Sequence, residues 1–132
     1  MSEHAANFHR SIPADTGAPS AARKAVRDFL RGVGVDPGAL SDVLLAVSEV
    51  VTNCVVHAYR GQPGGNVDLE ARRNGGTLHL SVADAGAGMA PRHDSPGLGL
   101  GLPLVGRVAQ NVDITAQAGG GTLVRMSFDL DR

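Results

Sequence analysis

The sequence predicts an α+β fold, a two-layer α/β sandwich in which helices pack on one face of a mixed, mostly antiparallel sheet. Three stretches carry apolar residues at helical spacing, and several shorter ones alternate apolar and polar residues, as strands with one buried face do. Their order along the chain is strand, helix, helix, two strands, helix, two strands. A chain of 132 residues fits one domain, so we expect residues 1–132 to form a single unit.

The composition argues against nucleic acid and membranes as partners. The formal net charge of -1 provides no attraction to polyanions, and a chain with no Trp, one Tyr and three Phe has few rings on which bases could stack. No unbroken apolar run reaches the roughly 18–20 residues of a membrane span, and the first residues lack the apolar core of a signal peptide. We therefore expect a cytoplasmic protein.

The N-terminal part predicts an edge strand over residues 7–12 and then a helix that Ser20 caps. The apolar face of this helix consists of Ala22, Val26, Phe29, Leu30 and Val33. Arg23, Arg27 and Arg31 fall four apart on another face and form a basic stripe. A basic stripe of this kind either faces solvent or docks a partner.

The second predicted helix begins near Asp36-Pro37 or Ser41 and runs to about Tyr59, because Gly61 and Pro63 end it. Its apolar set is Val43, Leu44, Val47, Val50, Val51, Cys54 and Val55. Cys54, the single cysteine, can form no internal disulfide, and a thiol in such a run more often serves as a small hydrophobe than as a reactive group.

Two of the polar residues within this apolar helix share a face. Glu49 and Asn53 stand four apart, hence on one face, with His57 one turn further on. The amide oxygen of Asn53 suits Mg²⁺, an ion that shares its coordination with phosphate oxygens, and the carboxylate of Glu49 could orient or deprotonate a nucleophile beside it. The alternative is a simple hydrogen bond between the two side chains.

The second half of the chain predicts four more strands and one helix. The strands are expected at residues 67–72, 78–83, 111–116 and 122–130, and the helix at 102–110. Gly75-Gly76 lies between the first two of these strands and predicts a hairpin turn. The first pair is therefore expected to be antiparallel.

The segment Asp84-Ala-Gly-Ala-Gly88 follows a predicted strand directly. An ionised aspartate only accepts hydrogen bonds, so Asp84 at the base of a pocket would favour the exocyclic amine of adenine over the carbonyl of guanine. Gly86 and Gly88 would let the chain turn beneath the ring, and Met89 and Leu98 are candidates to enclose it. The alternative is an ordinary Asp-Gly turn.

The loop Gly97–Gly101 precedes the third predicted helix, and backbone N–H groups at such a helix start bind anions. It is not a Walker A loop, because the only lysine is Lys24 in the first helix, and its spacing does not fit a dinucleotide-binding fingerprint. Phosphate charge would have to be met by Mg²⁺, backbone N–H groups and an arginine such as Arg60 or Arg92. In Gly119-Gly-Gly-Thr122 the hydroxyl of Thr122 could complete an adenine pocket, although such glycines usually form a hairpin turn.

Four segments, in this order, resemble the motifs of the gyrase, heat-shock chaperone, histidine kinase and mismatch-repair ATPase superfamily, the GHKL superfamily. They are Glu49–Asn53, Asp84–Gly88, Gly97–Gly101 and Gly119–Thr122. The stretch Ser48–Tyr59 and the small size look most like the bacterial anti-sigma-factor serine kinases. The resemblance covers nearly the whole chain and implies the Bergerat-type ATP-binding fold.

The resemblance implies a role for each matching residue. Glu49 falls on the general base, Asn53 on the Mg²⁺ ligand, Asp84 on the adenine anchor, and Arg23 near a partner-contacting arginine. The nucleotide-contacting set carried over is Asn53, His57, Asp84, Gly86, Gly88, Met89, Leu98, Gly99, Leu100, Gly101 and Thr122. The implied cofactors are ATP and Mg²⁺. The implied activity is transfer of the γ-phosphoryl group of ATP to a serine of an anti-anti-sigma protein of the STAS type, alternating with capture of a sigma factor, and members commonly form homodimers.

The alternative is a nucleotide-dependent binding module that regulates a sigma factor or another partner without significant kinase activity. It is motivated by the segment 89–96, which is shorter than the lid of typical members. A histidine kinase fragment is a third and weaker hypothesis, because no phosphoacceptor helix precedes the predicted domain.

Overall fold

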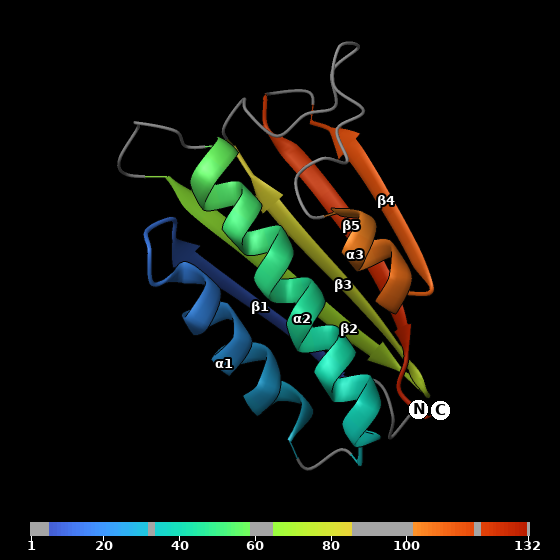
Figure 1. Ribbon diagram of the computed structural model, residues 1–132. Coiled ribbons are helices and arrows are strands. Elements are labelled where there is room, and N and C mark those ends of the chain that lie inside the picture. The colour runs from blue at the N-terminus through green and yellow to red at the C-terminus, as the bar shows by residue number, and fades with distance from the viewer. Residues whose placement is uncertain (1–5, 32–33, 59–64, 86–101, 118–119, 132) are drawn as a thin grey trace.

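The computed structural model of the chain describes residues 6–31, 34–58, 65–85, 102–117 and 120–131. Figure 1 shows its helices and strands. In chain order these are β1 (Ala6–Pro13), α1 (Ala18–Leu30), α2 (Pro37–Asn53), the π-helical turn η1 (Cys54–Ala58), β2 (Asn66–Asn74), β3 (Thr77–Asp84), α3 (Leu102–Val108), β4 (Asn111–Ala116) and β5 (Thr122–Asp129).

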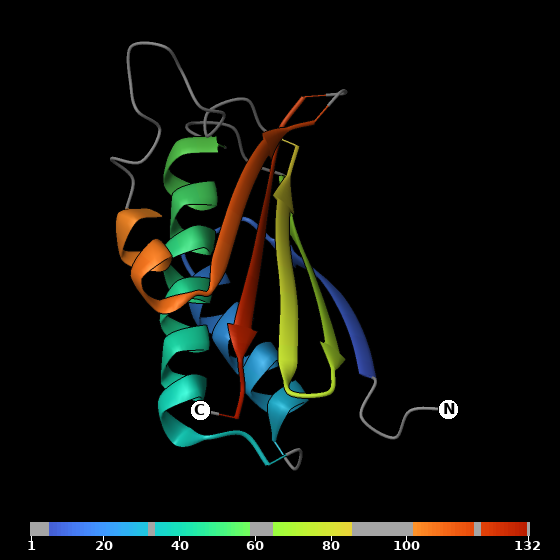
Figure 2. The same ribbon diagram turned by 90° about the vertical axis from the view of Figure 1, so that its right-hand side faces the viewer.

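The five strands form one sheet in the order β1-β2-β3-β5-β4. All four pairings between these described strands are antiparallel, so the sheet shows none of the parallel pairing of a mixed sheet. Figure 2 shows α1, α2 and α3 together on one face of the sheet. The predicted two-layer α+β sandwich is therefore confirmed.

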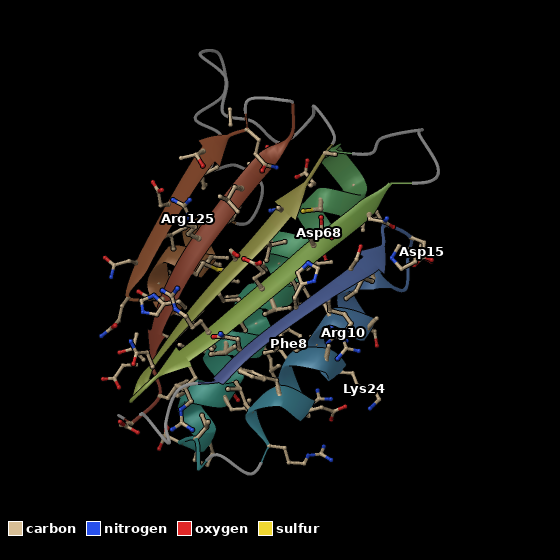
Figure 3. All side chains as sticks on the ribbon, turned by 180° about the vertical axis from the view of Figure 1, so that it is seen from behind. Phe8, Arg10, Asp15, Lys24, Asp68 and Arg125 are labelled. Carbon is tan, nitrogen blue, oxygen red and sulfur yellow. The ribbon has the colours of Figure 1, made fainter. Side chains whose placement is uncertain are left out.

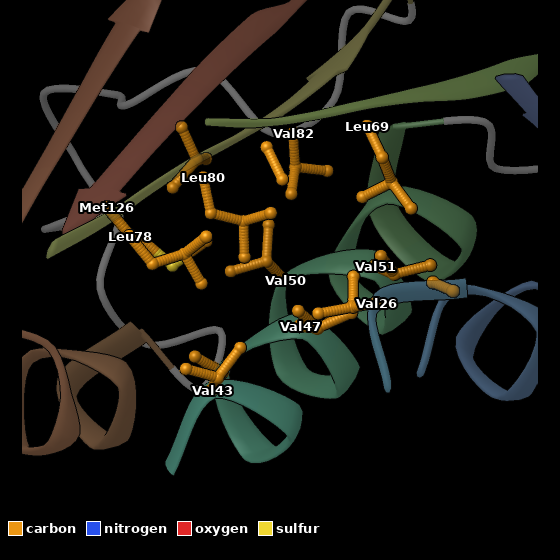
Figure 4. Close-up of a cluster of buried hydrophobic side chains, with 14 of the residues drawn as sticks. Val26, Val43, Val47, Val50, Val51, Leu69, Leu78, Leu80, Val82 and Met126 are labelled. Atoms are coloured by element: carbon orange, nitrogen blue, oxygen red, sulfur yellow. The ribbon is translucent and has the colours of Figure 1, made fainter. Parts of the chain in front are cut away.

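The core lies between α2 and the middle of the sheet. Val43, Val47 and Val50 of α2 are fully buried, and they meet Leu80 and Val82 of β3 in the cluster of Figure 4. Each such side chain contributes about 1.5–3 kcal/mol through removal of its apolar surface from water. The central helix is apolar for this reason.

Residues Pro37–Val56 form a helix of 20 residues that is long and apolar enough, by composition alone, to cross a membrane. Its mean hydropathy of 1.7 stays high although polar residues such as Ser48, Glu49 and Asn53 interrupt the apolar run. Its buried valines pack on the sheet, as those of a core helix do.

Several element boundaries differ from the predictions. Helix α1 begins at Ala18 with Gly17 at the N-cap, so the prediction that Ser20 caps it is wrong; Pro19 fits the first turn because its missing N–H has no helical partner. Helix α2 begins at Pro37, where Asp36 accepts a hydrogen bond from the backbone N–H of Ala39 at 3.1 Å, as the first of the two predicted starts required. Helix α3 ends at Val108, two residues before its predicted end.

The face of the sheet turned away from the helices is polar, as Figure 3 shows from behind. An open hollow of about 750 Å³ lies on it, and its lining includes Glu70, Arg72, His79 and Arg125. These side chains alternate along their strands with the buried ones. The hollow is therefore on the opposite side of the sheet from α2, which carries Asn53.

Candidate functional site

Three of the four predicted motif segments meet at one end of the sandwich. Asp84 is the last residue of β3, and its partner across the antiparallel pair is Thr122, the first residue of β5. The thiol of Cys54, next to Asn53, lies 3.7 Å from Oδ2 of Asp84. In Figure 1 the ends of α2 and β3 and the start of β5 accordingly lie at the same end of the molecule. Segments that are far apart in the sequence thus form one cluster.

The polar side chains of this cluster are buried. Asn53 is 6% exposed, Asp84 is 3% exposed and Thr122 is fully buried. Among the residues that the structure describes, Nδ2 of Asn53 and Oγ1 of Thr122 have no hydrogen-bond partner. A buried polar atom without a partner costs about 1–3 kcal/mol, so the protein gains this free energy when a ligand or water completes the site.

Glu49 and Asn53 occupy successive turns of α2 on one face, as their spacing predicted. Glu49 is half-buried, whereas Asn53 is buried and is the last α-helical residue before the helix widens into η1. Widened turns of this kind occur often at functional sites, because they change the direction in which side chains project. A carboxylate accessible to solvent thus lies one turn from a buried amide.

The environment of Cys54 keeps its thiol protonated. Burial raises the pKa of this thiol well above its ordinary value of 9.0, and the neighbouring charge of Asp84 and the hydrogen bond to it raise the pKa further. The sequence prediction that Cys54 is buried is confirmed. The contact with Asp84 was not predicted, because helical periodicity places the thiol in the core without showing which strand residue it meets.

The turn between β4 and β5 packs directly against the end of β3. Gly121 has a φ of 95°, and a Cβ at this position would overlap the carbonyl oxygen of Asp84 and lie 2.8 Å from Cα of Ala85. Nε2 of Gln117 donates to the same carbonyl oxygen at 2.9 Å and to that of Thr122 at 3.4 Å. Glycine is therefore required at 121 for close approach, and Gln117 holds the turn beside Asp84.

Gln117 is a site residue that sequence reasoning missed. The signal was its position immediately after the predicted strand 111–116 and before the glycines, where a polar side chain can bond to exposed backbone ends. Its partner could not be read from the sequence, because that depends on the pairing of β5 with β3.

The guanidinium of Arg23 points to the second helix. Its Nη1 donates to Oγ of Ser48 on α2 at 2.8 Å, and the side chain is half-buried. Arg31 is exposed and lies 3.6 Å from Asp28. The predicted basic stripe is therefore not uniform, because the guanidinium of Arg23 turns to α2 and lies beside the residue that precedes Glu49.

Several predicted nucleotide contacts cannot be placed. Nine of these residues lie outside the described part of the chain: Arg60, Gly86, Gly88, Met89, Arg92, Leu98, Gly99, Leu100 and Gly101. For His57 the structure describes the backbone, which belongs to η1. The roles predicted for these residues remain predictions.

The described residues fit a nucleotide with its magnesium ion. The amide of Asn53 provides an oxygen that suits Mg²⁺ and an unpartnered N–H₂ that suits a phosphate oxygen or a metal-bound water. The carboxylate of Asp84 suits an amine donor, and the hydroxyl of Thr122 can donate or accept. Among the described residues, no group of three or more His, Cys, Asp or Glu side chains could hold a metal ion.

Comparison with known proteins gives a consistent result. Residues 12–128 match the family described as histidine kinase-like ATPase domain. An anti-sigma F factor of Clostridium beijerinckii is 31% identical over 114 residues, which cover 78% of this chain and 80% of that protein. An anti-sigma F factor of Geobacillus stearothermophilus is 32% identical over 82 residues, 62% of this chain and 56% of that protein, so this match spans little more than half of the relative's length.

Two solved structures share the fold. A crystal structure of the RsbU and RsbW domains of a Mycobacterium tuberculosis protein matches with a TM-score of 0.76 and 24% identity, over 96% of this chain and 33% of that one. The SiaB–SiaC complex of Pseudomonas aeruginosa matches with a TM-score of 0.70 and 16% identity, over 91% of this chain and 88% of that one. The antiparallel sandwich and the polar cluster at its end are consistent with the family match, which spans most of the chain. The chain therefore belongs to the histidine kinase-like ATPase domain family of the GHKL superfamily, with anti-sigma F factors among its relatives.

Proposed function

We propose that this chain is a cytoplasmic, ATP-binding anti-sigma regulatory factor that also acts as a protein serine kinase on an anti-anti-sigma partner. The observation that carries the proposal is the cluster of Asn53, Asp84 and Thr122, in which a buried amide and a buried hydroxyl without partners lie with a buried carboxylate at one end of the sheet. The anti-sigma F factors among its relatives support the choice of partners.

Each described residue has a defined task in this proposal. Asp84 and Thr122 bind the adenine at the end of β3 and β5, and the amide oxygen of Asn53 would hold Mg²⁺. The ion would supply neutralisation of the charge on the phosphates of ATP. Arg23 binds the partner protein, and its hydrogen bond to Ser48 connects that surface to the turn of α2 that carries Glu49.

Glu49 is the general base of the proposed transfer. It accepts the proton of the partner's serine hydroxyl while the serine oxygen bonds to the γ-phosphorus, and the bond between that phosphorus and the β–γ bridging oxygen breaks to release ADP. Its half-exposed position on α2, one turn from Asn53, leaves the carboxylate accessible to a partner's hydroxyl while the amide stays buried. Removal of such a base typically slows transfer by about 10²–10⁴-fold.

The test combines transfer and binding. The chain is incubated with Mg-ATP and a purified STAS-type anti-anti-sigma protein of the same organism, and phosphoserine is measured by mass spectrometry. Wild type should phosphorylate the partner, Glu49→Gln should bind ADP normally but transfer little phosphate, and Asn53→Ala should lose the Mg²⁺ dependence of ADP binding.

The outcomes separate the two hypotheses. Failure of wild type to bind ADP would refute the proposal altogether. Tight Mg-ATP binding and ATP-dependent capture of a sigma factor without phosphoserine would leave the regulatory binding module in its place. Loss of both ADP binding and transfer in Glu49→Gln would count against the role assigned to Glu49.

A further inference from the structure

The single cysteine of the chain lies inside the proposed nucleotide cluster, although its sequence context is that of a core residue. Cys54 is fully buried, and its Sγ lies 3.7 Å from Oδ2 of Asp84, within the range for a hydrogen bond that involves sulfur. A protonated thiol is a donor and an ionised carboxylate is only an acceptor, so the thiol donates to the carboxylate. Cys54 thus contacts the group that is proposed to read the adenine.

We infer that Cys54 is a positioning residue for base selection: its S–H holds the carboxylate of Asp84 in the orientation in which it accepts a hydrogen bond from the adenine amine. This inference rests on the proposed function, because it deepens the role assigned there to Asp84. It concerns the choice between adenine and guanine and adds no step to the phosphoryl transfer.

The physical reason is the geometry of the pair. The S–H contact with Oδ2 restrains rotation of the carboxylate, and a hydrogen bond from a ligand requires an aligned acceptor. A carboxylate held in this way accepts from the amine of adenine and offers no donor to the carbonyl oxygen of guanine. Loss of the thiol donor should therefore weaken adenine binding and reduce the discrimination against guanine.

A second observation places a ligand next to this pair. Thr122 is the cross-strand neighbour of Asp84, and such neighbours have their Cβ atoms about 4.5–5.5 Å apart on the same face of the sheet. Its hydroxyl is fully buried without a hydrogen-bond partner among the described residues, as is Nδ2 of Asn53, the residue before Cys54. These two buried polar groups flank the contact between Cys54 and Asp84, and a bound polar ligand could form the hydrogen bonds that they lack.

The experiment compares three variants by titration with Mg-ADP and Mg-GDP. Cys54→Ala removes the donor, Cys54→Ser retains a donor, and Val47→Ala is the matched control. Val47 is also fully buried on α2, seven residues earlier and so on the same face, and it has no polar partner. Both alanine variants remove a similar buried volume, and unfolding in urea measures the loss of stability in each.

Cys54→Ala should weaken ADP binding by about five- to tenfold and lower the ADP-to-GDP preference by a similar factor, the size expected for one hydrogen bond. Cys54→Ser should restore most of the preference, and Val47→Ala should lose stability with the preference unchanged. The S–H stretching band, which only this one cysteine produces, should shift between wild type and Asp84→Asn.

Equal ADP-to-GDP preferences in wild type, Cys54→Ala and Val47→Ala would overturn the inference while leaving the proposed function standing. An S–H band that does not respond to Asp84→Asn would overturn it as well, even if Cys54→Ala binds poorly. Wild type that binds neither nucleotide would overturn the inference together with the proposed function.

Discussion

Replacement of Gly121 by alanine should damage the candidate site through one contact that the structure defines. The residue has a φ of 95°, so alanine there costs roughly 1–2 kcal/mol in backbone strain. The new Cβ would overlap the carbonyl oxygen of Asp84 and lie 2.8 Å from Cα of Ala85, where an ordinary contact begins at 3.4 Å. The turn must therefore move away from β3, and the 2.9 Å hydrogen bond from Gln117 to Asp84 must lengthen or break, at a further cost of about 1 kcal/mol.

Gly120 provides the control for this prediction. Its φ is 100°, but no atom of the residues that the structure describes lies within 4 Å of a Cβ built on it, so Gly120→Ala carries the backbone strain without the overlap. In urea unfolding followed by circular dichroism, we expect losses of about 2–4 kcal/mol for Gly121→Ala and about 1–2 kcal/mol for Gly120→Ala. In ADP titration, only Gly121→Ala should weaken binding, by roughly tenfold. Equal stability losses and equal ADP affinities in the two variants would refute the reasoning.

Two further predictions concern stability alone. Burial raises the pKa of the Cys54 thiol in the folded state, so the unfolded chain loses the thiol proton first once the pH exceeds the ordinary pKa of 9.0. The free energy of unfolding should therefore fall as the pH rises past that value. Relative to Cys54→Ser, the expected loss is up to about 1.4 kcal/mol per pH unit. Parallel urea-denaturation profiles of wild type and Cys54→Ser across this pH range would contradict it. Asp36→Ala should lower the free energy of unfolding by about 1 kcal/mol, because the N-cap of α2 is lost. The affinity for ADP should not change, because Asp36 and Asn53 lie at opposite ends of α2. A variant as stable as wild type, or one with a weaker affinity for ADP, would count against Asp36 as a purely structural cap.

The order of the elements could be predicted from the sequence because each one depends on a local pattern. Alternation in 67–72 and 78–83 predicted the hairpin of β2 and β3, and Gly75 supplies the positive φ of 63° that its turn uses. The start of α1 was misplaced for an equally local reason. Ser20 is a good capping residue, but the N-cap is Gly17, three residues earlier, and the helix begins at Ala18 with Pro19 in the first turn.

The motifs also indicated which side chains to examine. Glu49, Asn53, Asp84 and Thr122 are chemically suited to a nucleotide, and their spacing predicted that the first two share a helix face. That Asn53 is almost completely buried while Glu49 is half-exposed follows from how α2 is rotated on the sheet. A helical pattern of apolar residues defines that rotation only approximately.

The sequence by itself determined the strands and helices, the faces they bury and the residue types available for binding, because these follow from periodicity and side-chain chemistry. Only the tertiary structure decided that the thiol of Cys54 meets Asp84, that Gln117 bonds to the carbonyl of Asp84, and that Arg23 turns to Ser48. Each of these contacts joins residues 25 to 33 positions apart. They depend on strand register and helix packing, which no local pattern specifies.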